Sequence, residues 1–79
     1  MNVTVRYFAS LRDAAGREQE SLDWRGGSLG ELYDELRARH GFRLPRERLR
    51  VALDHAFAEW SAEPREGSEI VFVPPVSGG

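Results

Sequence analysis

The sequence predicts a single α+β domain, in which a mixed sheet of about four or five strands carries one main helix across one face. Three observations support this fold class. Short β-prone segments lie at residues 3–8 and 69–73, and a capped amphipathic pattern lies between them at residues 28–41. The length of 79 residues allows one modest core, because a domain of this size buries only about 60% of the surface that its unfolded chain exposes.

The first third of the chain is expected to form two strands around a short helix. Apolar and polar residues alternate with a period of two over residues 3–8, which is typical of a half-buried strand. Ser10 is predicted to cap a short helix that ends at Gly16. A second strand is expected over residues 18–24, and its acidic start, which includes Glu20, is predicted to lie at an exposed edge.

The main helix is predicted over residues 29–40. Ser28 and Glu31 match a capping box, in which each side chain accepts a hydrogen bond from the backbone N–H of the other residue. Gly41 is a natural stop, because glycine adopts the left-handed conformation that ends many helices. The apolar stripe at helical spacing consists of Leu29, Leu32, Tyr33, Leu36 and His40.

The second half of the chain is expected to complete the sheet. Residues 42–49 are predicted to form an irregular loop, and strand candidates follow at residues 50–53 and 56–60. The apolar run at residues 69–73 predicts a final, central strand. This order of elements is that of a β-grasp sheet, whose first and last strands pair in parallel at the centre.

Composition narrows the class of protein. Apolar residues make up 41% of the chain and charged residues 30%, which suits a globular domain. No apolar run approaches the ~20 residues of a membrane span and no signal peptide is visible, so no membrane association is expected and the cytoplasm is the expected location. Without cysteine, the chain holds neither a side-chain persulfide nor a thiolate nucleophile.

The charges are unevenly distributed. All eleven basic residues are arginine, and the formal net charge is −2. Residues 37–50 hold six arginines against Glu47, a local charge of +5, whereas the other residues hold five arginines against twelve acids, or −7. This basic segment lacks interleaved aromatic residues and the chain is acidic overall, so we expect a solvated or partner-facing surface and no nucleic acid.

The side chains offer no clear catalytic or metal site. His40 and His55 do not fall in a metal-ligand spacing, and the glycine pair at residues 26–27 does not open a phosphate-binding loop. We therefore expect this chain itself to bind no cofactor and no metal, and to be no enzyme on its own.

The C-terminal segment is the most informative feature for function. A body at residues 1–74 is expected to carry an extended tail at residues 75–79, because proline cannot continue a central strand. The tail would project about 15 Å and ends in Gly78-Gly79, whose lack of Cβ atoms lets it enter a narrow cleft. The candidate reactive group is the α-carboxylate of Gly79, which needs activation by adenylation on a partner. A frayed end or a cloning scar is the alternative.

Three segments resemble one known family, and the resemblance extends over essentially the whole chain. Residues 5–12 (Val-Arg-Tyr-Phe-Ala-Ser-Leu-Arg), residues 67–72 and the closing Phe72-Val73-Pro74-Pro75-Val76-Ser77-Gly78-Gly79 resemble the small subunit of molybdopterin synthase. Members of this family are ubiquitin-like sulfur carriers. Ser68 and Asp54 depart from residues common in the family, but both suit turns.

This resemblance implies a ubiquitin-like β-grasp fold and a carrier function. An adenylyltransferase related to ubiquitin-activating enzymes would use ATP and Mg to adenylate Gly79, and a sulfur donor system would convert the adenylate to a thiocarboxylate. The tail would then enter the large subunit of molybdopterin synthase, in a heterotetramer, and donate its sulfur to cyclic pyranopterin monophosphate for the molybdenum cofactor. Catalytic residues are expected in the large subunit.

The resemblance also implies which residues face partners. Alternation directs Tyr7 toward the helix and Phe8 to the opposite side of the sheet, where it would form an exposed hydrophobic patch near Phe72. Membership of the core is the alternative for both phenylalanines. The implied partner-binding residues are Phe8, Arg12, Phe72, Pro74, Pro75, Val76 and Ser77, beside the reactive end at Gly78 and Gly79.

Other functions share the same tail chemistry. A sulfur carrier for thiamine synthesis or tRNA thiolation would use the same thiocarboxylate. A ubiquitin-like protein modifier would instead pass the activated carboxylate to lysines of other proteins. A simple interaction domain would use its aromatic face and never its terminus.

Overall fold

The computed structural model describes residues 1–75 and contains a five-stranded sheet with two α-helices. Val76, Ser77, Gly78 and Gly79 lie outside the described residues. In chain order the elements are β1 (Asn2–Arg6), α1 (Ala9–Ala15), β2 (Gln19–Asp23), α2 (Leu29–His40), the short 3₁₀ helix η1 (Arg46–Arg48), β3 (Arg50–Leu53), β4 (Ala56–Ala58) and β5 (Glu69–Val73).

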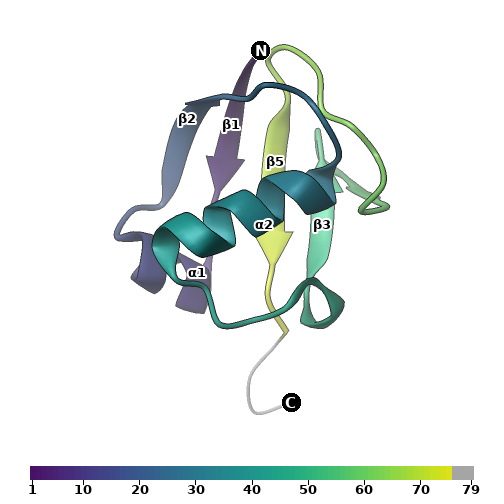
Figure 1. Cartoon of the computed structure of the whole chain (residues 1–79). Coiled ribbons are helices and arrows are strands. Elements are labelled where there is room, and N and C mark those ends of the chain that lie inside the picture. Colours follow the sequence, from purple (N-terminus) through teal and green to yellow (C-terminus); the bar gives the residue numbers. More distant parts are fainter. Residues whose placement is uncertain (76–79) are drawn as a thin grey trace.

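The sheet is mixed, with the strand order β2-β1-β5-β3-β4. The first and last strands of the described chain pair in parallel, with Val5 opposite Ile70, and the other pairs are antiparallel. Helix α2 crosses one face of this sheet (Figure 1). The predicted fold class and the predicted parallel pair are both confirmed. No helix within residues 1–75 is long and apolar enough to cross a membrane.

The core lies between α2 and the sheet. The helix contributes its predicted stripe, and Leu29, Leu32, Tyr33 and Leu36 are fully buried. Alternate residues of β1 and β5 face the helix, as their burial patterns show. The sheet side of the core includes Val3, Val5, Ile70, Phe72 and Val51. Burial of each such side chain contributes about 1.5–3 kcal/mol, so this single layer holds most of the stability of the domain.

Both ends of α2 are fixed by local sequence. The Glu31 backbone N–H donates to Oγ of Ser28 at 3.1 Å, and the Ser28 backbone N–H donates to the Glu31 carboxylate at 2.8 Å. These hydrogen bonds hold the pKa of the Glu31 carboxyl below its usual range. At the other end Gly41 adopts φ 75° and its N–H bonds the carbonyl of Arg37. The predicted capping box and stop are confirmed.

The prediction for the start of α1 is wrong. The helix begins at Ala9 with Phe8 in the N-cap position, and Ser10 lies inside the helix without capping it. The Phe8 carbonyl accepts hydrogen bonds from the N–H groups of Leu11 and Arg12, so the backbone of Phe8 closes the first turn. Ala9 turns the chain with φ 51°. The C-terminal stop at Gly16 is confirmed.

The prediction that the acidic start of the second strand lies at an exposed edge is right for the edge position and for Glu18, whose side chain is 82% exposed, but wrong for Glu20. Its side chain is only 8% exposed, and it accepts a hydrogen bond from the Tyr7 hydroxyl. His40, at the end of α2, lies 2.8 Å from the same carboxylate. Although β2 is an edge strand, Glu20 points to the face that the end of α2 covers, and the carboxylate is therefore enclosed by polar partners.

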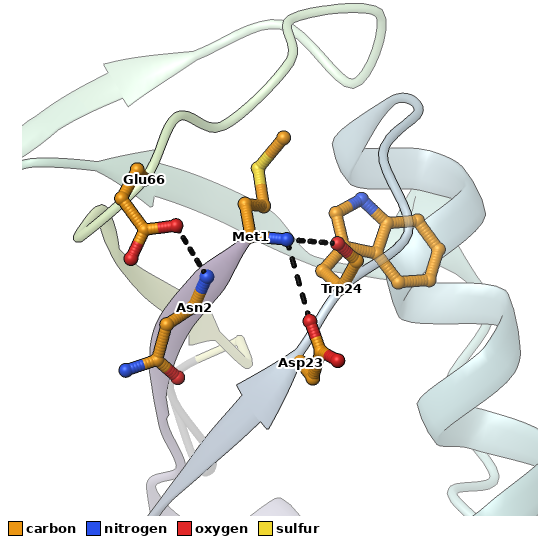
Figure 2. A network of polar contacts seen from close by, with 5 residues as sticks. All are labelled: Met1, Asn2, Asp23, Trp24 and Glu66. Atoms are coloured by element: carbon orange, nitrogen blue, oxygen red, sulfur yellow. Dashed lines mark hydrogen bonds and ion pairs between the residues drawn. The ribbon is translucent and has the colours of Figure 1, made fainter.

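The end of the sheet that carries the N-terminus is tied to its neighbours (Figure 2). The Met1 amine donates to the Trp24 carbonyl at 2.8 Å and to the Asp23 carboxylate at 3.3 Å. The Asn2 N–H donates to the Glu66 carboxylate at 2.8 Å. These bonds join β1 to the end of β2 and to the turn before β5. The start of β5, the parallel partner of β1, is therefore anchored, and the chain continues toward the tail from the other end of β5.

Candidate functional site

The face of the sheet that points away from α2, here called the open face, is partly apolar. Arg6, Val71, Ala52 and Phe57 lie side by side across β1, β5, β3 and β4, because each is the register partner of the next. Val71 and Ala52 are half-buried by their neighbours alone. Arg6 and Phe57 at the two ends of the row are exposed, and the row is therefore a candidate binding surface.

Two aromatic side chains on this surface are exposed, and each is paired with an arginine. Phe8 is 43% exposed, and the Arg6 guanidinium carbon lies 5.7 Å from its ring centroid. Phe57 is 59% exposed, and the Arg50 guanidinium carbon lies 3.8 Å from its centroid. Cations over aromatic faces are attracted by the negative charge of the ring face. Exposed Phe8 and buried Tyr7 confirm the alternation that the sequence predicts.

The predicted exposed patch of Phe8 with Phe72 is wrong. Phe72 has no exposed surface, and its ring centroid lies 5.0 Å from that of Tyr33 and 6.1 Å from that of Trp60. It faces α2 because Ile70 and Phe72 share the inner face of β5, whereas Val71 and Val73 point to the open face. The core alternative is therefore right for Phe72, which fixes the strand just before the tail and does not present itself to a partner.

Phe57 is the residue that the sequence reasoning missed. It stands between two alanines in a three-residue strand, opposite Ala52. A large apolar side chain flanked by small ones in a short edge strand was the available signal. Phe57 is the most exposed of the large hydrophobic residues described.

Arg12 and Phe8 lie close together. With Arg6 they line a small hollow of about 90 Å³ between α1 and the start of β2. The Arg12 guanidinium also lies 3.9 Å from the Glu18 carboxylate, an exposed pair that adds little stability. The binding role of Arg12 stays a prediction.

The chain leaves the body beside a groove of about 400 Å³. Val73 ends β5, Pro74 is half-buried and Pro75 is exposed. Leu49 and Phe57 form the apolar wall opposite these residues. The prolines leave β5 without further backbone donors, so β5 ends here and the chain departs from the middle of the sheet.

The buried titratable groups lie on the helix side of the sheet, away from this groove. Burial raises the pKa of the Glu20 carboxyl, but hydrogen bonds from Tyr7 and His40 and the charge of Arg17 outweigh it, so the net pKa is lowered. Burial, together with Glu20, strongly raises the pKa of Tyr7. Within residues 1–75 no three His, Asp or Glu side chains are grouped so as to hold a metal ion. The contacts of Glu20 with Tyr7 and His40 join β2 to β1 and to α2.

A five-stranded mixed sheet, one helix across one face and a chain that departs from the central strand define a small ubiquitin-like β-grasp protein. A sequence profile described as the ThiS family matches residues 5–79. The chain belongs to the ThiS family.

Comparison with known proteins agrees with this assignment. The molybdopterin synthase sulfur carrier subunit of Mycobacterium tuberculosis is 29% identical over 86 residues, which cover 100% of this chain and 99% of that protein. SAMP1 of Haloferax volcanii, a small archaeal modifier protein, superposes with a TM-score of 0.82 at 24% identity over 100% of both chains. A chain from the complex of subunits 1 and 2 of molybdopterin-converting factor of Helicobacter pylori superposes with a TM-score of 0.70 at 25% identity, again over 100% of both chains. The resemblance expected from the sequence motifs is confirmed.

Proposed function

We propose that this protein is a sulfur carrier and serves as the small subunit of a molybdopterin synthase. The observation that carries this proposal is the extent of the family match, which runs through residue 79 and so includes Gly78 and Gly79. The similarity to the M. tuberculosis sulfur carrier subunit spans the whole chain and supports the same role.

The proposed chemistry takes place at the Gly79 carboxylate. A carboxylate oxygen attacks the α-phosphorus of ATP, which forms an acyl adenylate and releases pyrophosphate. A persulfide of the donor system then attacks the acyl carbon and displaces AMP, which gives an acyl disulfide. A second thiolate of the donor attacks the sulfur–sulfur bond, which leaves the thiocarboxylate on Gly79 and a disulfide on the donor. ATP, Mg and the groups that activate them belong to the partner adenylyltransferase. The carrier supplies an acyl group that no side chain shields.

The acceptor of the sulfur would be cyclic pyranopterin monophosphate, bound to a large subunit. Two thiocarboxylates would each transfer one sulfur atom to build the dithiolene, and each carrier would return to a carboxylate by taking oxygen from water. The H. pylori complex of two subunits supports a large-subunit partner. Phe8, Arg12, Pro74 and Pro75 are the described residues proposed to contact it, together with residues 76–79.

The experiment that tests this function measures mass. The full chain is incubated with its adenylyltransferase, ATP and a sulfide source, and intact-mass analysis should detect an increase of about 16 Da as one oxygen is replaced by sulfur. A chain with one alanine added after Gly79 is the control and should remain unchanged. If the wild-type mass does not change while the adenylyltransferase is demonstrably active, the proposal fails.

Two further measurements separate the alternatives. The fold is shared with SAMP1, a small archaeal modifier protein. Isopeptides between Gly79 and lysines of other proteins in cell extracts would therefore favour a protein modifier. Co-purification with a thiamine or tRNA thiolation enzyme in place of a molybdopterin synthase large subunit would assign the carrier to those pathways.

A further inference from the structure

We propose that the end of the body from which the tail departs is a basic docking surface, and that the partner surface that receives the tail is acidic around its entrance. This inference rests on the proposed function, because it concerns the protein that accepts the tail. We call the surface the arginine collar and define it by Arg48 and Arg50.

The collar arginines are exposed, and neither forms an ion pair with an acid within residues 1–75. Residues 43–50 contain four arginines and one acid, Glu47, so this segment carries a charge of +3 and the other residues sum to −5. Arg46 pairs with Asp34 at 3.6 Å. The ion pairs found within residues 1–75 include neither Arg48 nor Arg50. Their charge is thus available to another molecule.

The register of the sheet places the collar at the tail. Arg50 is the direct partner of Val73, the last residue of β5, so the start of β3 lies beside the exit of the chain. Arg48 and Arg50 line the same groove of about 400 Å³ as Pro74 and Pro75. Glu47 is the one acid among the described residues of this groove. A partner that holds the tail therefore meets these guanidinium groups.

The groove combines this charge with an apolar wall. The guanidinium carbon of Arg50 lies over the exposed ring of Phe57, 3.8 Å from its centroid, and this contact holds the guanidinium in place. Leu49 and Val73 add further apolar surface. A matching partner segment presents an apolar side chain beside carboxylates, which pair with guanidinium groups through two parallel hydrogen bonds.

The charges along the sheet are arranged to orient the approach. The end opposite the tail carries Asp23, Asp54 and Glu66. Asp23 pairs with the Met1 amine, Glu66 accepts from the Asn2 N–H, and Asp54 accepts from the N–H of Glu69, the first residue of β5. The chain is acidic overall but basic where the tail begins. An acidic entrance on the partner attracts this end and repels the other, which raises the rate of productive encounters.

The test measures association of the full chain, without sulfur loading, with the cognate large subunit by stopped-flow fluorescence. Arg48→Glu and Arg50→Glu are compared with Arg65→Glu, a matched control with the same charge change. Arg65 is exposed and lies in the turn before β5, which is bonded to Asn2 at the other end of the sheet. We expect the association rate to fall about tenfold for each collar variant at low salt and to stay within roughly twofold of wild type for Arg65→Glu. High salt should remove most of the difference between wild type and the collar variants.

The outcomes separate the collar from the function. If Arg48→Glu, Arg50→Glu and Arg65→Glu associate at the wild-type rate, or if all three slow equally, the collar is wrong while the carrier function stands. If wild type does not bind the large subunit, the assigned partner is wrong and the collar falls with it. Thiocarboxylate formation is measured separately and tests the function alone.

Arg48→Glu removes a charge that touches no aromatic ring described here, so a loss of Phe57 packing in Arg50→Glu does not obscure the result. Tighter binding of wild type to duplex DNA than to the large subunit would also overturn the collar.

Discussion

The imidazole of His40 lies 2.8 Å from the carboxylate of Glu20, and this contact fastens the C-terminal end of α2 to the edge strand β2. The Tyr7 hydroxyl donates to the same carboxylate from β1. Arg17 adds an ion pair at 3.6 Å. The side chains of Glu20 and His40 are only 8% and 14% exposed, so water screens this contact little.

We predict that the contacts around Glu20 make the free energy of unfolding fall as the pH is lowered. The pKa of Glu20 lies below its ordinary value of 4.5, so its ionised form stabilises the fold above that pH, and this contribution is lost as pH falls through the lower pKa of the folded state. Chemical unfolding followed from pH 7 to pH 3 should show a steeper loss for wild type than for Glu20→Gln. At pH 7 the variant should be less stable by about 2 kcal/mol. Equal slopes for the two proteins would contradict this assignment.

The cap of α2 gives a second prediction. Ser28→Ala removes the hydroxyl that accepts from the Glu31 N–H and should lower the free energy of unfolding by about 1 kcal/mol. Ser10→Ala is the matched control, because Ser10 lies inside α1 and caps nothing, and it should change stability by less than about 0.5 kcal/mol. Urea unfolding measures both. A larger loss for Ser10→Ala would restore the cap that the sequence suggested.

Substitutions of two phenylalanines should have different effects on the free energy of unfolding and on partner binding. Phe72 is fully buried, and Phe72→Ala should cost about 3–5 kcal/mol of unfolding free energy. Phe57 is 59% exposed, and Phe57→Ala should cost less than about 1 kcal/mol. In a titration against the large subunit, Phe57→Ala should nevertheless weaken binding. If Phe57→Ala is as destabilising as Phe72→Ala, the open face is not a free surface.

Gly30 lies in the first turn of α2 beneath the Arg46 side chain. A Cβ at Gly30 would meet the guanidinium of Arg46, a flexible group that moves away by giving up its exposed ion pair with Asp34. Alanine stabilises a helix by about 1 kcal/mol relative to glycine, and the loss of an exposed ion pair costs at most about the same amount. Gly30→Ala should therefore be nearly neutral alone, but should stabilise an Arg46→Ala protein by about 1 kcal/mol. Thermal or urea unfolding of the four proteins of this cycle provides the test.

Local signals predicted the elements well. The limits of α2 follow from Ser28, Glu31 and Gly41, which act through neighbouring backbone groups, and the bounds of β3 and β5 agree with the prediction. The short fourth strand ends at Ala58, earlier than expected, because Trp60 turns back to pack against Tyr33 and the core.

The direction of some side chains could not be predicted. Residues 70–73 are all apolar, so alternation does not tell which of them face α2, and Phe72 was placed on the wrong side. Glu20 looks like an exposed acid until the end of α2 is placed over β2. Phe57 becomes a surface residue only through its register with Ala52. In each case the answer depends on contacts distant in the sequence.

The parallel pairing of β1 with β5 has a consequence for biosynthesis. β5 is the last strand of the described chain to leave the ribosome, yet it lies between β1 and β3. Until residues 69–73 emerge, β1 and β3 have no common neighbour, and the hydrophobic layer beneath α2 cannot close. A nascent chain from which residues 69–73 have not yet emerged therefore stays open to proteases, and the compact body forms only after β5 has left the ribosome.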